Sequence, residues 1–185
     1  HAYYALLEFT SPKYGDNLRS QIERVLEQAF SDKIITDAVI AESMAQAKEL
    51  WKIREEIPAA QSKEGVSIKH DVAVPVSLSV EFIKKATQLV EAELPGIRVC
   101  AFGHIGDGNI HFNLTQPEDM SPENFLGMWD HFNKIVNDYV ATLNGSFSAE
   151  HGIGEIKRKE LARYTDPIGI ELMRTMKKTL DPKNI

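Results

Sequence analysis

A tight-turn signal in the middle of the chain constrains its fold more than any other feature. Asp107 and Gly108 separate two β-prone runs, and an Asp-Gly pair accepts the positive φ angles that a two-residue type I′ turn requires. We therefore predict a β-hairpin that turns at these two residues and pairs His104 with His111. Because opposed residues of an antiparallel pair project from the same face, the two imidazoles are expected to stand side by side.

The paired histidines suggest a metal site that lacks a third ligand. The best candidate for it is Glu150, which is followed by His151 in a segment rich in glycine. Two histidines and one carboxylate, with coordination positions left open, are typical of catalytic divalent-metal sites. His151 is then expected to lie beside the cation without necessarily binding it.

Each of these residues also has a simpler interpretation. The two hairpin histidines could be hydrogen-bonded to backbone or water, Glu150 could be an ordinary salt-bridge partner, and His151 could be a loop residue. Asn113 follows His111 by two residues and shares its face, although asparagine also commonly closes a strand.

Two cations occupy positions that fit an anionic ligand. Arg54 continues the apolar stripe of its predicted helix, where a guanidinium either extends to water or meets an anion. Lys69 lies on the polar face of a predicted strand, where a solvated lysine is the common outcome. Near a metal site, the two cations together would suit a small carboxylate substrate.

Hydrophobic periodicity predicts an α+β domain in which helices cover an antiparallel sheet. Strands are expected over residues 2–9, 33–41, 66–75, 97–104 and 109–114. Helices are expected over residues 16–30, 42–57, 79–94, 122–143, 156–164 and 168–180. In the last of these helices the inward-facing residues are predicted to be Leu172, Met173, Met176 and Leu180.

Composition narrows the function classes. The net charge of −6 disfavours a surface for nucleic acid or anionic membranes, and the sequence has no apolar run of membrane-spanning length. Cys100 is the only cysteine, so we expect a reducing compartment, the cytoplasm or, in a eukaryote, the mitochondrial matrix. The glycine patterns of dinucleotide and P-loop sites do not occur. The chain ends suggest a fragment of a longer protein.

Four motifs together resemble one known family. They are Gly-His-Ile-Gly-Asp-Gly-Asn-Ile-His-Phe-Asn (103–113), Ser-Ala-Glu-His-Gly-Ile-Gly (148–154), Trp-Lys-Ile-Arg-Glu (51–55) and Lys-His-Asp-Val-Ala-Val-Pro (69–75). The sequence is similar to the C-terminal, substrate-binding domain of FAD-linked oxidases. These are the D-lactate, D-2-hydroxyglutarate and glycolate dehydrogenases of the vanillyl-alcohol-oxidase superfamily.

The resemblance implies roles for seven residues. His104, His111 and Glu150 match the divalent-metal ligands of the family, usually assigned as zinc. His151 matches its catalytic base. The residues that match its substrate contacts are Arg54, Lys69 and Asn113. Pro58 stands where members specific for 2-hydroxyglutarate carry a threonine, which leaves the substrate open among D-lactate, D-2-hydroxyglutarate, D-malate and glycolate.

The resemblance also implies a ferredoxin-like core, with residues 1–185 as one domain that works with an N-terminal FAD-binding domain. The expected reaction is oxidation of the 2-hydroxy acid to the 2-oxo acid with hydride transfer to FAD, and the isolated chain is expected to be inactive. A homodimer is possible. Two other classes stay open, a metal-binding structural module and a metallohydrolase, although no His-Glu-x-x-His motif occurs.

Overall fold

The computed structural model describes residues 3–13 and 15–185, and the chain divides into two compact units, residues 1–60 and 61–185. The first unit contains α1 (Leu18–Ser31) and α2 (Met44–Glu55). Both helices begin at a polar cap, because the side chains of Asn17 and Ser43 each accept a backbone N–H of the first turn. The helices predicted over residues 16–30 and 42–57 are thus confirmed to within a few residues.

Two strand predictions in this unit are wrong. Residues 3–9 and 33–41 form no strand in the structure, and the prediction for residue 2 lies outside the described residues. Strands need a neighbour that accepts and donates their backbone hydrogen bonds. In the described part of the chain neither segment pairs with a strand, and side chains such as Tyr4, Leu7 and Val39 are exposed.

The second unit holds the sheet. Its elements, with α3 crossing the boundary between the units, are α3 (Ile57–Lys63), β1 (Ser67–Ala73), η1 (Val76–Leu78), α4 (Ser79–Glu93), β2 (Arg98–His104), β3 (Asn109–Thr115), α5 (Pro122–Gly127), α6 (Trp129–Thr142), α7 (Arg158–Tyr164) and α8 (Pro167–Leu180). The strand order is β1-β3-β2, and both pairings are antiparallel. Ser146 pairs with Ala73 through an isolated antiparallel bridge. The element order is therefore the β-α-β-β-α-β of a ferredoxin-like core, with its last strand reduced to one bridge, and the predicted α+β class is confirmed.

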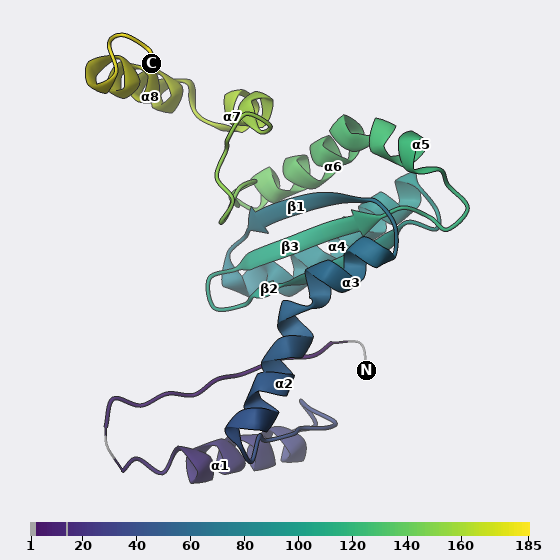
Figure 1. Cartoon of the computed structure of the whole chain (residues 1–185), viewed down its shortest axis with the longest axis vertical. Coiled ribbons are helices and arrows are strands. Elements are labelled where there is room, and N and C mark those ends of the chain that lie inside the picture. The colour runs from purple at the N-terminus through teal and green to yellow at the C-terminus, as the bar shows by residue number, and fades with distance from the viewer. Residues whose placement is uncertain (1–2, 14) are drawn as a thin grey trace. The chain divides into compact units, whose positions relative to one another are not determined.

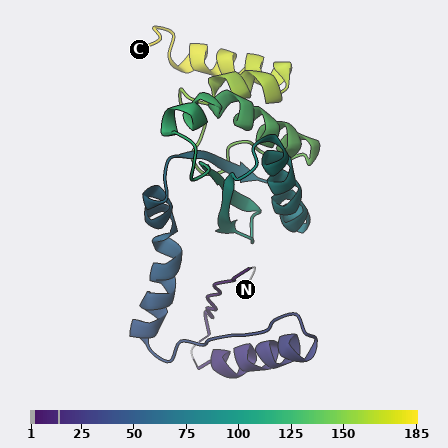
Figure 2. The ribbon, with the colours of Figure 1, turned by 90° about the vertical axis from the view of Figure 1, so that its right-hand side faces the viewer.

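The sheet has one apolar and one polar face, as the alternation in β1 predicts. Helices α4 and α6 cover the apolar face, where Ile68, Val72, Phe112 and Leu114 are fully buried. Figure 1 and Figure 2 show α3 on the opposite side of the sheet from α4. Gln61 of α3 bonds to Thr115 on that polar face, at 3.1 Å. The apolar core therefore covers one face of the sheet, and the polar side chains lie on the other face.

The hairpin forms, but its register differs from the prediction by two residues. His104 pairs with Asn109, and His111 pairs with Phe102, so the loop is longer than the predicted two-residue turn. Only Gly108 of the turn pair has a positive φ, +73°, whereas a type I′ turn needs positive φ at both central residues. The Asp107 side chain instead accepts the Asn109 N–H at 3.0 Å. A shift of two residues keeps every side chain on its predicted face.

Two helix predictions also need correction. The helix predicted over residues 122–143 is two helices, because the chain turns at Gly127 and Met128 between α5 and α6, and glycine is a weak helix former. The four residues of α8 predicted to face inward are exposed, because no described segment packs on that side. They are Leu172, Met173, Met176 and Leu180.

Gly108 offers the first test. A Cβ at this position would lie 1.9 Å from the Val74 carbonyl oxygen, while one at Gly106 would meet nothing within 4 Å. We expect Gly108→Ala to lower the free energy of unfolding by about 2 kcal/mol or more, from positive φ and backbone overlap. Gly106→Ala is the matched control in the same loop. Equal urea midpoints for the two variants would contradict the described turn.

His70 offers a second test. Its ring is buried in the core, Nδ1 lies 2.9 Å from the Phe112 carbonyl oxygen, and burial lowers its pKa to about 4. The folded state therefore disfavours the protonated ring. The stability that the neutral ring provides is fully present above the unfolded pKa of about 6.5 and falls as the pH drops toward 4.

We expect His70→Gln to flatten the fall in unfolding free energy between pH 7 and pH 4 by up to about 3 kcal/mol. Urea unfolding at several pH values measures this difference. Parallel stability curves for the two proteins would show that His70 does not contribute to the acid sensitivity.

Candidate metal centre

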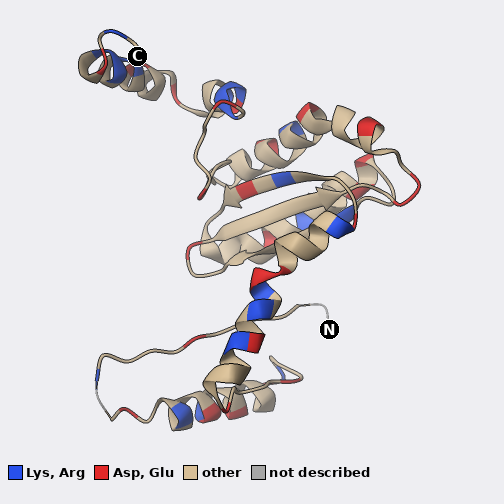
Figure 3. Ribbon diagram, in the orientation of Figure 1, with Lys and Arg blue, Asp and Glu red and all other residues tan. Residues whose placement is uncertain are grey.

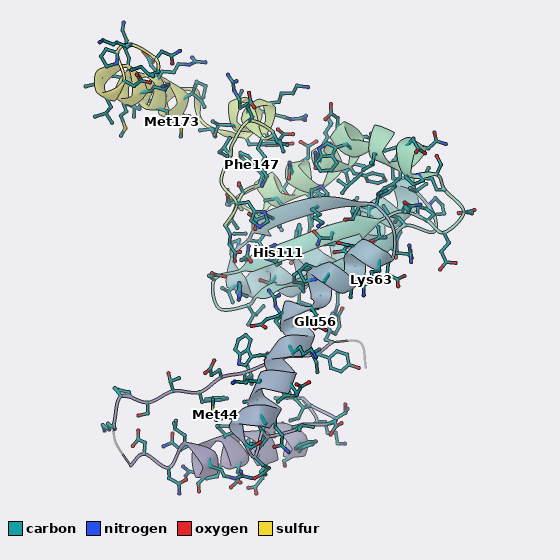
Figure 4. The ribbon with its side chains drawn as sticks, viewed as in Figure 1. Met44, Glu56, Lys63, His111, Phe147 and Met173 are labelled. Carbon is teal, nitrogen blue, oxygen red and sulfur yellow. The ribbon has the colours of Figure 1, made fainter. Side chains whose placement is uncertain are left out.

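The candidate centre lies on the polar face of the sheet. On that face Asp71 of β1 pairs with His111 of β3, and Lys69 pairs with Asn113 in the neighbouring position. Figure 3 shows no charge along β3, and one basic and one acidic position on β1. Figure 4 shows His111 on the sheet and Phe147 in the segment that leads to α7. That segment carries Glu150 and His151.

Glu150 lies between the two hairpin histidines. Its Oε1 is 3.1 Å from His104 Nδ1, and its Oε2 is 3.7 Å from His111 Nε2. The register explains this arrangement, because His104 and His111 are diagonal neighbours rather than directly opposed. The carboxylate therefore connects two imidazoles that the predicted register would have placed side by side.

His151 lies over His111. The two rings are nearly parallel, with centroids 5.6 Å apart, and His151 Nδ1 is 3.7 Å from Asp71 Oδ2. The His151 side chain is 63% exposed, whereas that of His111 is 13% exposed. An imidazole that is both close to the candidate ligands and open to solvent can exchange a proton with a bound small molecule.

Asp71 is a buried carboxylate at the base of this group. Its Oδ2 accepts the backbone N–H groups of Glu150 and His151, both at 2.8 Å, and that of Ala149 at 3.2 Å. Its Oδ1 accepts the Asn109 amide at 2.9 Å. Burial raises the pKa of Asp71, but the His151 and Glu150 N–H groups and the Asn109 amide outweigh burial and hold the pKa below its usual value.

Further hydrogen bonds order the segment before Glu150. Lys157 Nζ donates to the Phe147 carbonyl and to Ser148 Oγ, both at 3.1 Å, and Ser148 Oγ donates to the Gly152 carbonyl at 2.6 Å. The φ of Gly152 is +68°, a conformation that favours glycine. The segment is therefore a defined loop, bound to the sheet at one end and to the start of α7 at the other.

The predicted substrate contacts occupy different parts of the structure. Lys69 is exposed, and its neighbour Asn113 is buried and donates its amide to Gln61 Oε1 at 2.9 Å. Both residues share the face of the candidate ligands. Arg54 is half-buried in α2, in the other unit of the chain, and its role stays a prediction.

Two sets of side chains on this face could hold a cation. Asp71, His111 and His151 each offer one ligand atom, and these atoms lie within 4.8 Å of one another. His104, His111 and Glu150 form the other set. Two ligands of a tetrahedral cation bound at 2.0–2.1 Å lie about 3.3 Å apart. In the second set, Glu150 Oε1 lies 3.1 Å from His104 Nδ1 and Glu150 Oε2 lies 3.7 Å from His111 Nε2, so a different oxygen faces each ring. Among the described residues, only the first set has all its ligand atoms within 4.8 Å of one another.

Sequence reasoning missed the polar residues beneath the site. Asp71, Asn109 and Gln61 are all buried, and none was predicted to have a role. For Asp71 a signal existed, because the strand alternation places it on the same face as Lys69 and next to the predicted hairpin. The long-range bonds of Asn109 and Gln61 left no comparable local pattern.

Comparisons with known proteins agree with the motifs. The family described as FAD linked oxidases, C-terminal domain, matches residues 1–185. A D-2-hydroxyglutarate dehydrogenase of Stutzerimonas stutzeri is 36% identical over 99% of this chain. A mitochondrial D-2-hydroxyglutarate dehydrogenase of Arabidopsis thaliana is 34% identical, also over 99% of this chain. A mitochondrial protein of Schizosaccharomyces pombe, provisionally named a D-lactate dehydrogenase, is 32% identical over the whole chain.

The matched region is only part of each relative. This chain spans 39% of the Stutzerimonas protein, 31% of the Arabidopsis protein and 36% of the Schizosaccharomyces protein. None of the described helices is long and apolar enough to cross a membrane.

Proposed function

Since this chain belongs to the FAD linked oxidases, C-terminal domain family, we propose that it binds substrate and a divalent cation in an FAD-dependent dehydrogenase. The proposed reaction oxidises a D-2-hydroxy acid to the 2-oxo acid. The observation that carries this proposal is the position of Glu150 between His104 and His111, with His151 as its neighbour in the chain. This arrangement combines a cation site with a residue free for proton transfer.

His104, His111 and Glu150 are the proposed ligands, and Asp71 is not one of them. The Oδ2 atom of Asp71 accepts three backbone N–H groups of residues 149–151, so we assign Asp71 to support of the loop that carries Glu150. Two imidazole nitrogens and a carboxylate suit zinc. When bound, such a cation polarises the substrate hydroxyl and favours loss of its proton.

His151 is the proposed general base. Histidine is the side chain most often used for proton transfer near neutral pH. The Asp71 carboxylate near Nδ1 favours a proton on that nitrogen and leaves Nε2 to accept the proton of the substrate 2-hydroxyl. When FAD is bound, it supplies the acceptor for the hydride that leaves the same carbon. Loss of one proton and one hydride converts the hydroxyl group into the carbonyl of the 2-oxo acid.

Lys69, Asn113 and Arg54 are the proposed contacts of the substrate carboxylates. Lys69 and Asn113 lie side by side on the polar face, and Gln61 holds the Asn113 amide in a fixed orientation. A guanidinium such as Arg54 binds carboxylate in two-pronged fashion. D-2-hydroxyglutarate, named in several relatives, is the first substrate to test, before D-lactate, D-malate and glycolate.

FAD is proposed to be held mainly by an N-terminal domain of the complete protein, because the relatives extend well beyond the matched region. The plant and yeast relatives carry mitochondrial names. These names support a matrix location if the source is a eukaryote, and the cytoplasm is proposed otherwise.

The ligand set can be tested by metal binding. We expect Glu150→Gln and His104→Ala to weaken Zn²⁺ affinity of the 185-residue chain by more than about 100-fold, since loss of a ligand exceeds the 10–100-fold effect of an outer partner. His131→Ala is a matched control, because His131 is similarly exposed and pairs with Glu93 on the helical side. Competition with a chromogenic chelator measures the affinity.

Removing the cation with a chelator distinguishes a structural role of the cation from a role in substrate binding. The apolar core lies on the other face of the sheet, so chelation should lower the melting temperature by only a few degrees. Cooperative unfolding on chelation would favour a structural metal module, and unchanged affinity in Glu150→Gln would contradict the proposed ligands.

The base can be tested in the complete FAD-containing protein. We expect His151→Gln to lower kcat for D-2-hydroxyglutarate about 100-fold or more, the usual size of a general-base effect, with zinc content unchanged. Dichlorophenolindophenol reduction measures turnover, and His131→Gln is the matched control. Near-normal turnover in His151→Gln would remove this residue from the proposed role.

A further inference from the structure

The buried carboxylate of Asp71, beneath the candidate site, accepts several hydrogen bonds from the loop that carries Glu150 and His151. Asp71 is 3% exposed, and one of its oxygens accepts three consecutive backbone N–H groups, from residues 149–151. The Asp71 carbonyl also accepts the Ala149 N–H, at 3.1 Å. Asp71 therefore binds the loop through both its backbone and its side chain.

We propose that Asp71 is the positioning residue of this site. One oxygen of its carboxylate fixes the backbone that carries Glu150 and His151, and the other side of the carboxylate orients the His111 ring. This inference rests on the proposed metal site and extends it to a residue that neither binds the cation nor touches the substrate.

The loop depends on Asp71 because few other bonds reach residues 149–151. Ahead of them, the Ser146 bridge to Ala73 joins the chain to the edge of β1. After them, the Gly152 carbonyl accepts the Ser148 hydroxyl at 2.6 Å, a bond within the loop that does not reach the sheet. Hydrogen bonds to a charged acceptor are stronger than those between neutral groups. Without the Asp71 carboxylate, Glu150 and His151 lose the only side-chain acceptor that their N–H groups have among the described residues.

The ring of His111 depends on Asp71 in a different way. His111 Nδ1 lies 3.7 Å from Asp71 Oδ1, and Nε2 lies 3.7 Å from Glu150 Oε2. A carboxylate near Nδ1 favours the tautomer with the proton on that nitrogen. The lone pair is then on Nε2, the nitrogen that faces Glu150. Asp71 thus sets the protonation pattern that a cation ligand needs.

Asn109 in turn fixes Asp71. Its amide donates to Asp71 Oδ1 at 2.9 Å, and Asn109 pairs with His104 at the start of β3. The bond therefore links the carboxylate to the strand pair that carries both hairpin histidines. Lys157, whose charge interacts with Asp71, holds the start of the loop through Phe147 and Ser148.

The test compares Asp71→Ala and Asp71→Asn in the 185-residue chain without metal. In Asp71→Ala we expect amide hydrogen exchange at Glu150 and His151 to rise about tenfold or more, from loss of a charged acceptor, with exchange in β3 unchanged. Asn can keep an oxygen toward these N–H groups, so Asp71→Asn should retain most of the protection. ¹⁵N NMR of the His111 ring should show the Nδ1–H tautomer in the native chain and a mixture in both variants.

Zinc affinity is the second measurement. We expect it to fall about 10–100-fold in both variants, the usual effect of losing an outer partner of a ligand. Asp138→Asn is the matched control. Asp138 also accepts several side-chain bonds and has a lowered pKa despite burial, owing to Lys134, Tyr164 and Arg163, but lies on α6. The control should lower the melting temperature without changing zinc affinity.

Three results would overturn the inference. They are unchanged amide exchange in Asp71→Ala, an unchanged His111 tautomer in both variants, and loss of zinc in His151→Ala as well as in Asp71→Asn, which would make Asp71 a ligand. Exchange and tautomer are measured without metal or FAD. If the proposed oxidation or zinc binding to the native chain failed, the exchange and tautomer measurements would still show whether Asp71 positions the loop and the His111 ring.

Discussion

The alternation of side chains along β1 and β3 is the constraint on which the second unit depends. Successive residues of a strand face opposite sides, so residues that seal the core against α4 and α6 alternate with residues that cannot join it. On the polar side, Asp71, Asn109 and Asn113 are nonetheless buried. Burying a polar group is costly unless it is hydrogen-bonded, and the Asp71 carboxylate and the amide nitrogens of Asn109 and Asn113 are bonded within the unit. The same requirement that stabilises this face also fixes the orientation of its side chains.

The sequence was sufficient to predict the faces of the sheet but not its register. The Asp-Gly pair indicated the hairpin, yet Asp107 accepts a backbone bond through its side chain instead of taking a positive φ. The loop is also held by the Val74 N–H, just after the end of β1, which donates to the Gly108 carbonyl with an N···O distance of 3.1 Å. A contact between distant segments is invisible to a local pattern. The predicted faces hold because an even shift preserves the face of every residue.

Long-range pairing also explains the other differences. Residues 3–9 and 33–41 have β-prone composition, but strand formation requires a partner that composition does not supply. The positions of Glu150 and His151 were predicted only as an association with the hairpin. The bond that holds them, through Asp71, joins residues about eighty positions apart in the chain. Local motifs thus indicated the candidate ligands and the candidate base, while the support beneath them depends on contacts between distant segments.

Adjacent placement of a candidate ligand and a candidate base has a mechanical consequence. Glu150 and His151 are bonded through their backbone N–H groups to the same Asp71 oxygen, so neither can move without disturbing the bond of the other. A cation held by Glu150 and a proton acceptor at His151 would then keep a fixed relation to each other. Hydroxyl oxidation needs the polarising group and the base on one oxygen at once. The buried Asp71 carboxylate would couple the cation and the base, because it holds both Glu150 and His151 from one position on the sheet.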